Sequence, residues 1–206
     1  MDKSRKEFID RLDQIQAFKF GDFILKSAQQ SPLYVDLRLC ISFPKLIESI
    51  AKAFAKKVQG LSFDAICGVP YAALAFATAL SLELKKPLLM RRKEKKAYGR
   101  KRKIEGLYEK GQKVLIVEDL ITSGSSAIDT AQDLENEGLV VKDFLVVLDR
   151  CQGGKEIVQQ RGYQLHALLE MQEVLSYLLA KGRLDPDIYD RVCSFLIEKR
   201  GQAIAL

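Results

Sequence analysis

From about residue 63 onward, the sequence alternates short apolar runs with longer amphipathic stretches. Short runs rich in Val, Ile and Leu are typical of strands that are buried on both faces, and the stretches between them have a helical period. The alternation predicts an α/β fold with a central parallel sheet flanked by helices. The expected strands cover residues 63–70, 86–93, 113–120, 140–150 and 163–170, and the expected helices 72–84, 125–137, 155–161, 172–181 and 185–199.

The N-terminal part has a different pattern. Residues 3–16 and 43–58 have a helical period, whereas residues 18–38 indicate short strands joined by turns. We interpret this part as a small cap. Because 206 residues suffice for one well-buried α/β domain with an appendage, we expect a single domain over 1–206, with the cap and N-terminal helices in 1–60 and the core in 61–206.

The sequence shows no stretch of the roughly 18 apolar residues that a membrane span needs, and its first residues carry charges instead of an apolar signal core. We therefore expect a soluble, cytoplasmic protein without a membrane partner. The four cysteines lie far apart without a C-x-x-C pair, and His166 is the only histidine, so free thiols are expected and neither a zinc site nor a disulfide framework is indicated.

The positive charge of the chain is concentrated in one segment. Residues 91–103 contain nine Lys or Arg and one Glu, a net charge of +8 against +6 for the whole chain, so the remainder carries −2. A local run of this kind is usually a solvated face or a patch that binds polyanions, and it can also be a loop that closes over a charged substrate.

Residues 113–138 contain the groups that most clearly indicate a ligand-binding site. A buried-type strand ends in Glu118 and Asp119, and a loop rich in Thr, Ser and Gly (residues 122–126) then leads into a helix. Ligands of parallel α/β sheets bind beyond the carboxyl ends of the strands, where two adjacent carboxylates can accept hydrogen bonds from vicinal hydroxyl groups. The loop offers backbone N–H groups, hydroxyls and the positive end of a helix to a phosphate. These groups suit a ribose 5-phosphate.

The loop matches neither G-x-x-x-x-G-K-[ST] nor G-x-G-x-x-G, so triphosphates and dinucleotides are disfavoured. A solvated turn followed by a Ser-capped helix is the plain structural alternative. The segment Val114 to Ser126, however, resembles the binding signature for phosphoribosyl pyrophosphate (PRPP) of the type I phosphoribosyltransferases. The resemblance implies that Glu118 and Asp119 hold the ribose hydroxyls and that residues 122–126 hold the 5-phosphate.

Within this family the chain resembles the orotate phosphoribosyltransferases, above all the orotate-transferring half of the UMP synthases. Residues 18–38, 67–78, 91–99 and 148–154 each resemble a segment of that family, in the expected order. There is no room for the decarboxylase barrel of the bifunctional proteins, so a stand-alone transferase is expected.

The resemblance assigns three groups of residues. PRPP ligands would be Lys26, Tyr71, Ala72, Glu118, Asp119, Leu120, Ile121, Thr122, Ser123, Gly124, Ser125 and Ser126. Orotate would contact Tyr34, Val35, Thr122 and Arg150. Catalysis would involve Arg92, Lys93, Lys96 and Tyr98 on a mobile basic loop.

Three positions depart from the family pattern. Ala72 stands where many bacterial members have lysine, Ala97 replaces a common aspartate, and Tyr98 replaces a common histidine. These changes argue against proton transfer by an imidazole and reduce the positive charge around pyrophosphate. The expected reaction passes through an oxocarbenium-like centre at C1 of the ribosyl group. Mg²⁺ is the expected cofactor, held mainly by PRPP, and no metal ligand is assigned in the protein.

The resemblance also implies a homodimer with shared active sites, in which the loop carrying Lys96 reaches the PRPP pocket of the neighbour. Two alternatives stay open. One is a phosphoribosyltransferase for another base. The other is a PRPP-sensing regulator of the same fold that binds nucleic acid through the basic run, although the N-terminal residues leave little room for a DNA-binding module, and no nucleic-acid partner is expected.

Overall fold

A computed structural model of the chain describes residues 1, 3–24, 30–93 and 103–205. The helices are α1 (Lys3–Gln14), the 3₁₀ helix η1 (Leu37–Ser42), α2 (Pro44–Lys57), α3 (Ala73–Leu84), α4 (Ser125–Asn136), α5 (Gly154–Gln160), α6 (Met171–Ala180) and α7 (Pro186–Ile204). The strands are β1 (Phe18–Ile24), β2 (Gln30–Val35), β3 (Ala65–Gly68), β4 (Leu88–Arg91), β5 (Ile104–Glu105), β6 (Lys113–Ile121), β7 (Val140–Asp149) and β8 (Gln164–Glu170).

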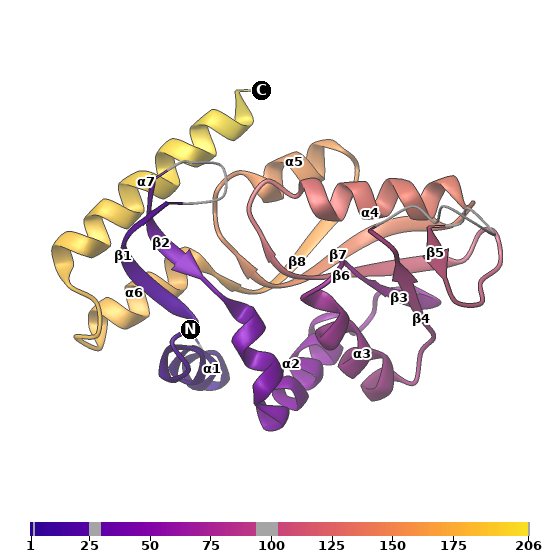
Figure 1. Ribbon diagram of the computed structural model, residues 1–206, viewed down its shortest axis with the longest axis horizontal. Coiled ribbons are helices and arrows are strands. Elements are labelled where there is room, and N and C mark those ends of the chain that lie inside the picture. Colours follow the sequence, from indigo (N-terminus) through magenta and orange to yellow (C-terminus); the bar gives the residue numbers. More distant parts are fainter. Residues whose placement is uncertain (2, 25–29, 94–102, 206) are drawn as a thin grey trace.

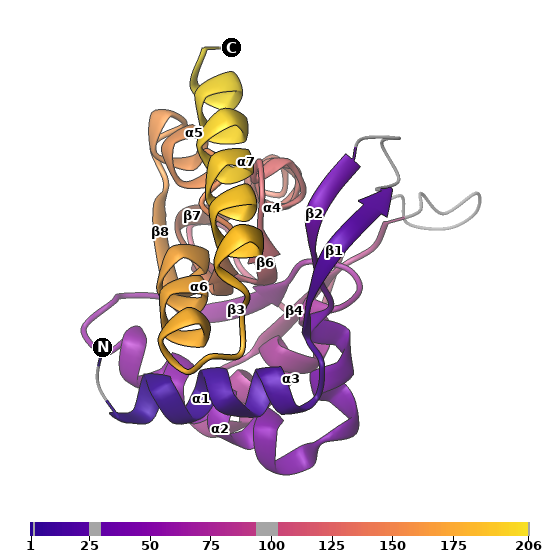
Figure 2. The same cartoon turned by 90° about the vertical axis from the view of Figure 1, so that its left-hand side faces the viewer.

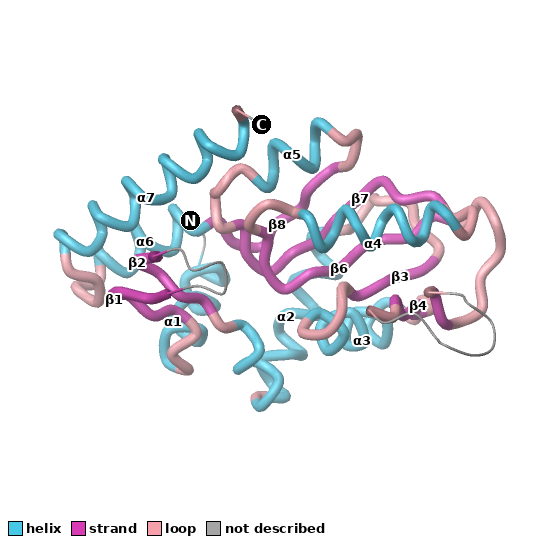
Figure 3. Tube along the Cα trace, turned by 45° about the horizontal axis from the view of Figure 1, so that its top comes forward, coloured by secondary structure: helices cyan, strands magenta, loops and turns pink. Residues whose placement is uncertain are grey.

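The central sheet has six strands in the order β5-β4-β3-β6-β7-β8. All neighbouring pairs are parallel except β4 and β5, which run antiparallel. Helices α4 and α5 cover one face and α2 and α3 the other (Figure 1). Figure 3 shows α4 running along the strands on its face of the sheet. The α/β class and all five predicted core strands are confirmed.

Most differences from prediction lie at the ends of elements, and two short elements, η1 and β5, are additional. Strands β3 and β4 are shorter than expected, α7 continues to Ile204, and the two-residue strand β5 was not predicted. Two residues are too few to show a period, so β5 could not be recognised from the sequence.

Alternation along the strands builds two cores, one on each face of the sheet. On β6, Leu115 and Val117 belong to the core under α2 and α3, whereas Val114 and Ile116 belong to the core under α4 and α5. Because both faces are covered, the strand is apolar at consecutive positions, which is why the run could be recognised in the sequence.

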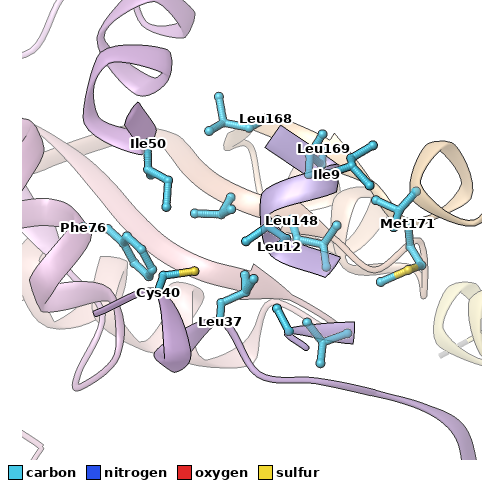
Figure 4. Close-up of a cluster of buried hydrophobic side chains, with 14 of the residues drawn as sticks. Ile9, Leu12, Leu37, Cys40, Ile50, Phe76, Leu148, Leu168, Leu169 and Met171 are labelled. Carbon is cyan, nitrogen blue, oxygen red and sulfur yellow. The ribbon is translucent and has the colours of Figure 1, made fainter. Parts of the chain in front are cut away.

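The predicted cap is an antiparallel hairpin of β1 and β2, whose strands run side by side in Figure 2, and β2 contacts α7. The N-terminal helices contribute to the same core as the sheet. Figure 4 shows side chains from α1, η1, α2, α3, β7, β8 and α6 packed in one cluster, among them Ile9, Leu12, Leu37, Cys40, Ile50, Phe76, Leu148, Leu168, Leu169 and Met171.

All four cysteines are free thiols, as predicted. Across the described residues, no helix combines the length and apolar character that a membrane crossing requires.

Candidate active site

A cavity of about 440 Å³ lies at the carboxyl end of β6. One wall comes from the end of β6, the loop after it and the first turn of α4, and the other from the end of β2 and η1. The lining residues are Tyr34, Val35, Asp36, Leu37, Arg38, Glu118, Asp119, Leu120, Thr122, Ser123, Gly124, Ser125 and Ser126. The structure thus brings together residues from two distant segments, and the edge of the sheet is the one that parallel α/β folds use for ligands.

Glu118 and Asp119 form a carboxyl pair with unusual protonation. Burial, with the charge of Asp119 as a second cause, raises the pKa of Glu118 to about 8. Burial also raises the pKa of Asp119, against the lowering effect of backbone hydrogen bonds and of Arg38. Near neutral pH, Glu118 is therefore largely protonated. A protonated Glu118 can donate a hydrogen bond to one hydroxyl, and Asp119 can accept a hydrogen bond from the neighbouring hydroxyl, so the pair suits two vicinal hydroxyls.

The loop after β6 presents the start of α4 to the cavity. Gly124 is the N-cap residue, with a φ of 77° and no side chain that caps the helix. The first N–H groups of a helix have no partner within it and attract anions. The Ser123 and Ser125 hydroxyls lie 3.3 Å apart on the same turn. This turn can hold a phosphate.

Glycine is required at Gly124 for two reasons. Its positive φ is costly for other residues, and a Cβ there would stand 2.9 Å from Cγ2 of Val158 on α5. A second glycine, Gly154 at the start of α5, has its Cβ position only 2.5 Å from the carbonyl oxygen of Thr122. The loop therefore lies directly against α5.

The opposite wall carries an ion pair that was not predicted. The Arg38 guanidinium donates from Nε to Asp36 Oδ1 at 2.6 Å, and from Nη2 to Asp36 Oδ2 at 2.7 Å and Tyr34 Oη at 3.0 Å. The hydrogen bond from Arg38 is the main reason why the pKa of Asp36 is lowered. This fork fixes Tyr34 beside the cavity. The sequence shows the acid and the base, Asp36 and Arg38, within the segment 18–38, but their shared contact with Tyr34 depends on the rotamers of the side chains.

Ile121, from the ribose phosphate signature, and Arg150, assigned to orotate, do not line the cavity. Ile121 is buried in the core between the sheet and α4. Arg150 follows β7, and its backbone N–H donates to the carbonyl oxygen of Ile121 at 3.0 Å. Its guanidinium is buried, its Nε and Nη2 have no hydrogen-bond partner among the described residues, and burial lowers its pKa.

The residues assigned to pyrophosphate lie beside one another at the ends of β3 and β4. Tyr71 is 59% exposed just before α3, and Lys93 Nζ lies 5.8 Å from the centroid of its ring, a cation–π contact. Ala72 is the N-cap residue of α3. Arg92 forms an ion pair with Glu105 at 3.2 Å. Lys26, Lys96 and Tyr98, and with them the departure at Ala97, lie outside the described residues.

Comparison with known proteins agrees with this geometry. Residues 42–161 match the family model of the phosphoribosyl transferase domain, which is more than half of the chain. The chain belongs to the phosphoribosyl transferase family. The resemblance found in residues 114–126 is thereby confirmed, and so is the fold that it implied.

Relatives extend the likeness over most of the chain. Orotate phosphoribosyltransferase from Chlamydia caviae is 40% identical, with 87% of this chain and 88% of that protein covered. Uridine 5'-monophosphate synthase from Bos taurus is 43% identical over 91% of this chain, which spans only 39% of that longer protein. The crystal structure of orotate phosphoribosyltransferase from Aeropyrum pernix superimposes with a TM-score of 0.75 at 29% identity, covering 83% of this chain and 97% of that one.

Proposed function

We propose that this chain transfers the phosphoribosyl group of PRPP to orotate, giving orotidine 5'-monophosphate and pyrophosphate, a step of UMP biosynthesis. The observation that carries the proposal is the direct succession of a buried carboxyl pair and an open helix N-terminus along one wall of the cavity. Two relatives named as orotate phosphoribosyltransferases, each matched over most of its length, support the choice of base.

The proposed orientation of the substrates follows from the two walls. The 5-phosphate would lie on the first turn of α4, and the ribose hydroxyls on Glu118 and Asp119. Orotate would lie toward Tyr34 and Val35 on the other wall. Its carboxylate would reach the two unsatisfied nitrogens of Arg150, since a buried guanidinium is a strong partner for a carboxylate.

The chemistry needs no covalent intermediate with the protein. The bond between C1 and the pyrophosphate oxygen breaks, with its electron pair leaving on pyrophosphate, and positive charge develops on the ribosyl ring. N1 of orotate then forms the new bond from the opposite face and gives up its proton to pyrophosphate or to water. Arg92 and Lys93 would face the departing pyrophosphate. Preorganised cations at such a position act on charge that develops in the transition state.

Mg²⁺ fits this site as an ion that enters with PRPP. The cavity offers carboxylate oxygens, which Mg²⁺ prefers, but Asp36 is occupied by Arg38. The described part of the chain holds no group of three His, Cys, Asp or Glu side chains that could bind a metal ion. When bound, the ion would neutralise the diphosphate, while Glu118 and Asp119 hold the ribose.

The direct test is an assay of PRPP with a panel of bases, followed by orotate consumption and product mass. Orotate should be consumed only when both PRPP and Mg²⁺ or Mn²⁺ are present, and adenine, hypoxanthine and uracil should not react. Excess EDTA should stop turnover, and added Mg²⁺ should restore it. Full turnover in EDTA would refute the metal requirement, and turnover of another base without orotate would refute the proposed substrate.

The proposed working unit is a two-fold dimer with shared sites. Leu39, Ile41 and Phe43 expose 36%, 49% and 46% of their surface directly after the cavity wall of residues 34–38, which would suit an apolar contact next to the site. In such a dimer Lys96 would act in the neighbour's cavity. With free cysteines and this metabolic role, we also propose a cytoplasmic location.

Subunit mixing tests this arrangement. Lys96→Ala and Asp119→Asn would each be nearly inactive alone. Refolded together in equal amounts, about half of the dimers would be mixed, and each of these would contain one intact site. Activity should return to about a quarter of the parent value. If the subunits exchange and activity stays at the level of either variant, Lys96 acts within its own subunit.

A further inference from the structure

Asp133 is a buried carboxylate on α4 that lies outside the cavity and binds two cations. Its Oδ2 accepts a hydrogen bond from Arg91 Nε and its Oδ1 one from Lys103 Nζ, both at 2.6 Å. The Asp133 and Arg91 side chains are only 10% and 14% exposed. Two short charge-assisted bonds at one buried carboxylate make a contact that is costly to break.

The two cations come from the two ends of one segment. Arg91 is the last residue of β4, and Lys103 directly precedes β5. The flanks are joined to each other as well, since the Arg92 N–H donates to the carbonyl oxygen of Lys103 at 2.8 Å and Arg91 pairs with Ile104 across the strands. Asp133 therefore holds both flanks against α4.

The same contacts reach the phosphate turn. Arg91 Nη1 lies 3.5 Å from Thr130 Oγ1, and the Thr130 hydroxyl donates to the carbonyl oxygen of Ser126 at 2.8 Å. Ser126 lines the cavity. A continuous set of contacts thus runs from the ends of β4 and β5 along α4 to the turn that would hold the 5-phosphate.

Asp133 stays ionised in this setting. Burial taken alone would raise its pKa, but the hydrogen bonds from Lys103 and Arg91 outweigh burial, and the pKa is lowered. The Asp133 carboxylate is thus held between the basic side chains of Arg91 and Lys103.

We propose that Asp133 is a positioning residue for the reaction. It sets where Arg92 and Lys93 stand relative to the phosphate turn, although it contacts no substrate itself. The role in turnover rests on the proposed function, because Arg92 and Lys93 are assigned there to the departing pyrophosphate. The anchoring of the two flanks does not depend on any substrate.

Asp133→Asn, with Asp129→Asn as the matched control, tests the proposal. Asp129 lies on the same helix, is exposed and is of the same residue type. Without substrates, amide hydrogen exchange over residues 88–93 and 103–107 should become at least about tenfold faster in Asp133→Asn and remain at the parent rate in Asp129→Asn. Exchange over β6 and β7 serves as the internal measure of an intact fold.

Turnover gives the second measurement. In Asp133→Asn, kcat with orotate and PRPP should fall about tenfold or more, with less than about a twofold change in the KM of orotate. Asp133→Glu, which keeps the carboxylate, should recover part of kcat. Exchange in the flanks at the parent rate would overturn the proposal. If the parent enzyme turns over orotate, an unchanged kcat in Asp133→Asn would also overturn the proposal.

A second variant covers the case in which Asp133→Asn does not fold. Lys103→Gln removes only one of the two bonds, and its side chain is 33% exposed. The same flanks should exchange faster in Lys103→Gln while β6 and β7 stay protected, and parent rates there would overturn the proposal. If the parent protein does not use orotate and PRPP, the proposed function fails, whereas the exchange result still decides whether Asp133 anchors the flanks.

Discussion

The wall of the cavity formed by β6 and α4 differs from the opposite wall, formed by β2 and η1, in how its polar groups are held. On the first wall, the polar groups are held by the path of the backbone. Residues 118–126 follow one another, and Gly124 and Gly154 bring the loop against α5. On the second, side chains hold each other, with Arg38 bridging Asp36 and Tyr34. Substitutions in the first wall should therefore reduce activity more than substitutions in the second wall.

The largest effect is expected from Asp119→Asn on the first wall. The change removes a carboxylate that would bind the ribose, and kcat/KM for PRPP should fall by about 10²- to 10³-fold, the range seen when one preorganised polar group is lost. Steady-state kinetics with varied PRPP measures it. Asp129→Asn, at an exposed position on α4, is the control, and an equal loss in both variants would contradict a specific role of Asp119 in the cavity.

Next in size is Gly154→Ala, which tests backbone positioning without removing any polar group. The new methyl would stand 2.5 Å from the Thr122 carbonyl oxygen and must displace the loop. We expect the KM for PRPP to rise about tenfold. Gly201→Ala on α7 is the control, because a Cβ there meets nothing within 4 Å. If Gly154→Ala has the same KM for PRPP as the parent, the position of the loop after β6 does not control PRPP binding.

A smaller effect is expected on the second wall from Arg38→Met. Tyr34 and Asp36 would lose their shared partner, and the KM for orotate should rise about threefold to tenfold, with little change for PRPP. Arg191→Met removes an exposed ion pair with Asp22 and is the control. A loss of PRPP affinity equal to that of orotate would contradict the division between the walls.

The smallest effect concerns stability and pH. Burial raises the pKa of Glu118 from its ordinary value of 4.5 to about 8, so between these pH values the folded state holds a proton that the unfolded state releases. Its contribution to the free energy of unfolding is complete below about pH 4.5 and is lost as the pH rises through 8. In Glu118→Gln, the free energy of unfolding should therefore change less with pH than in the parent.

Above pH 8, Glu118→Gln should be more stable than the parent by about 1 kcal/mol, or about 2–4 °C in Tm for a chain of this size. Thermal unfolding without ligand between pH 5 and pH 9 measures both curves. Parallel curves for parent and variant would show that the carboxyl is not protonated in the folded state.

The difference between groups held by the local backbone and groups held by side-chain contacts explains how much could be predicted from the sequence. The parallel sheet and residues 118–126 could be predicted because their signals are local: apolar runs, two acids and a turn. The fork of Arg38 could not, since it depends on rotamers. The pairing of Asp133 with Arg91 and Lys103 joins segments about 30 to 42 residues apart, and no local pattern reports such contacts.

Arg150 is a residue that was assigned to the site from the sequence but does not line the cavity. Resemblance assigned it to orotate. The structure places it beside Ile121 and not among the residues that line the cavity, and two of its nitrogens have no hydrogen-bond partner in the part of the chain that the structure describes. The sequence could place Arg150 at the end of a strand, but the direction of its side chain is set by contacts across the fold.

A crystal structure with orotidine 5'-monophosphate tests the central claim most directly. The phosphate should lie on the N–H groups of residues 123–126, the ribose hydroxyls within hydrogen-bond distance of Glu118 and Asp119, and the base against Tyr34 and Val35. The base carboxylate should accept hydrogen bonds from Arg150. A nucleotide bound with its base at the Glu118 and Asp119 end, or outside the cavity, would contradict the account.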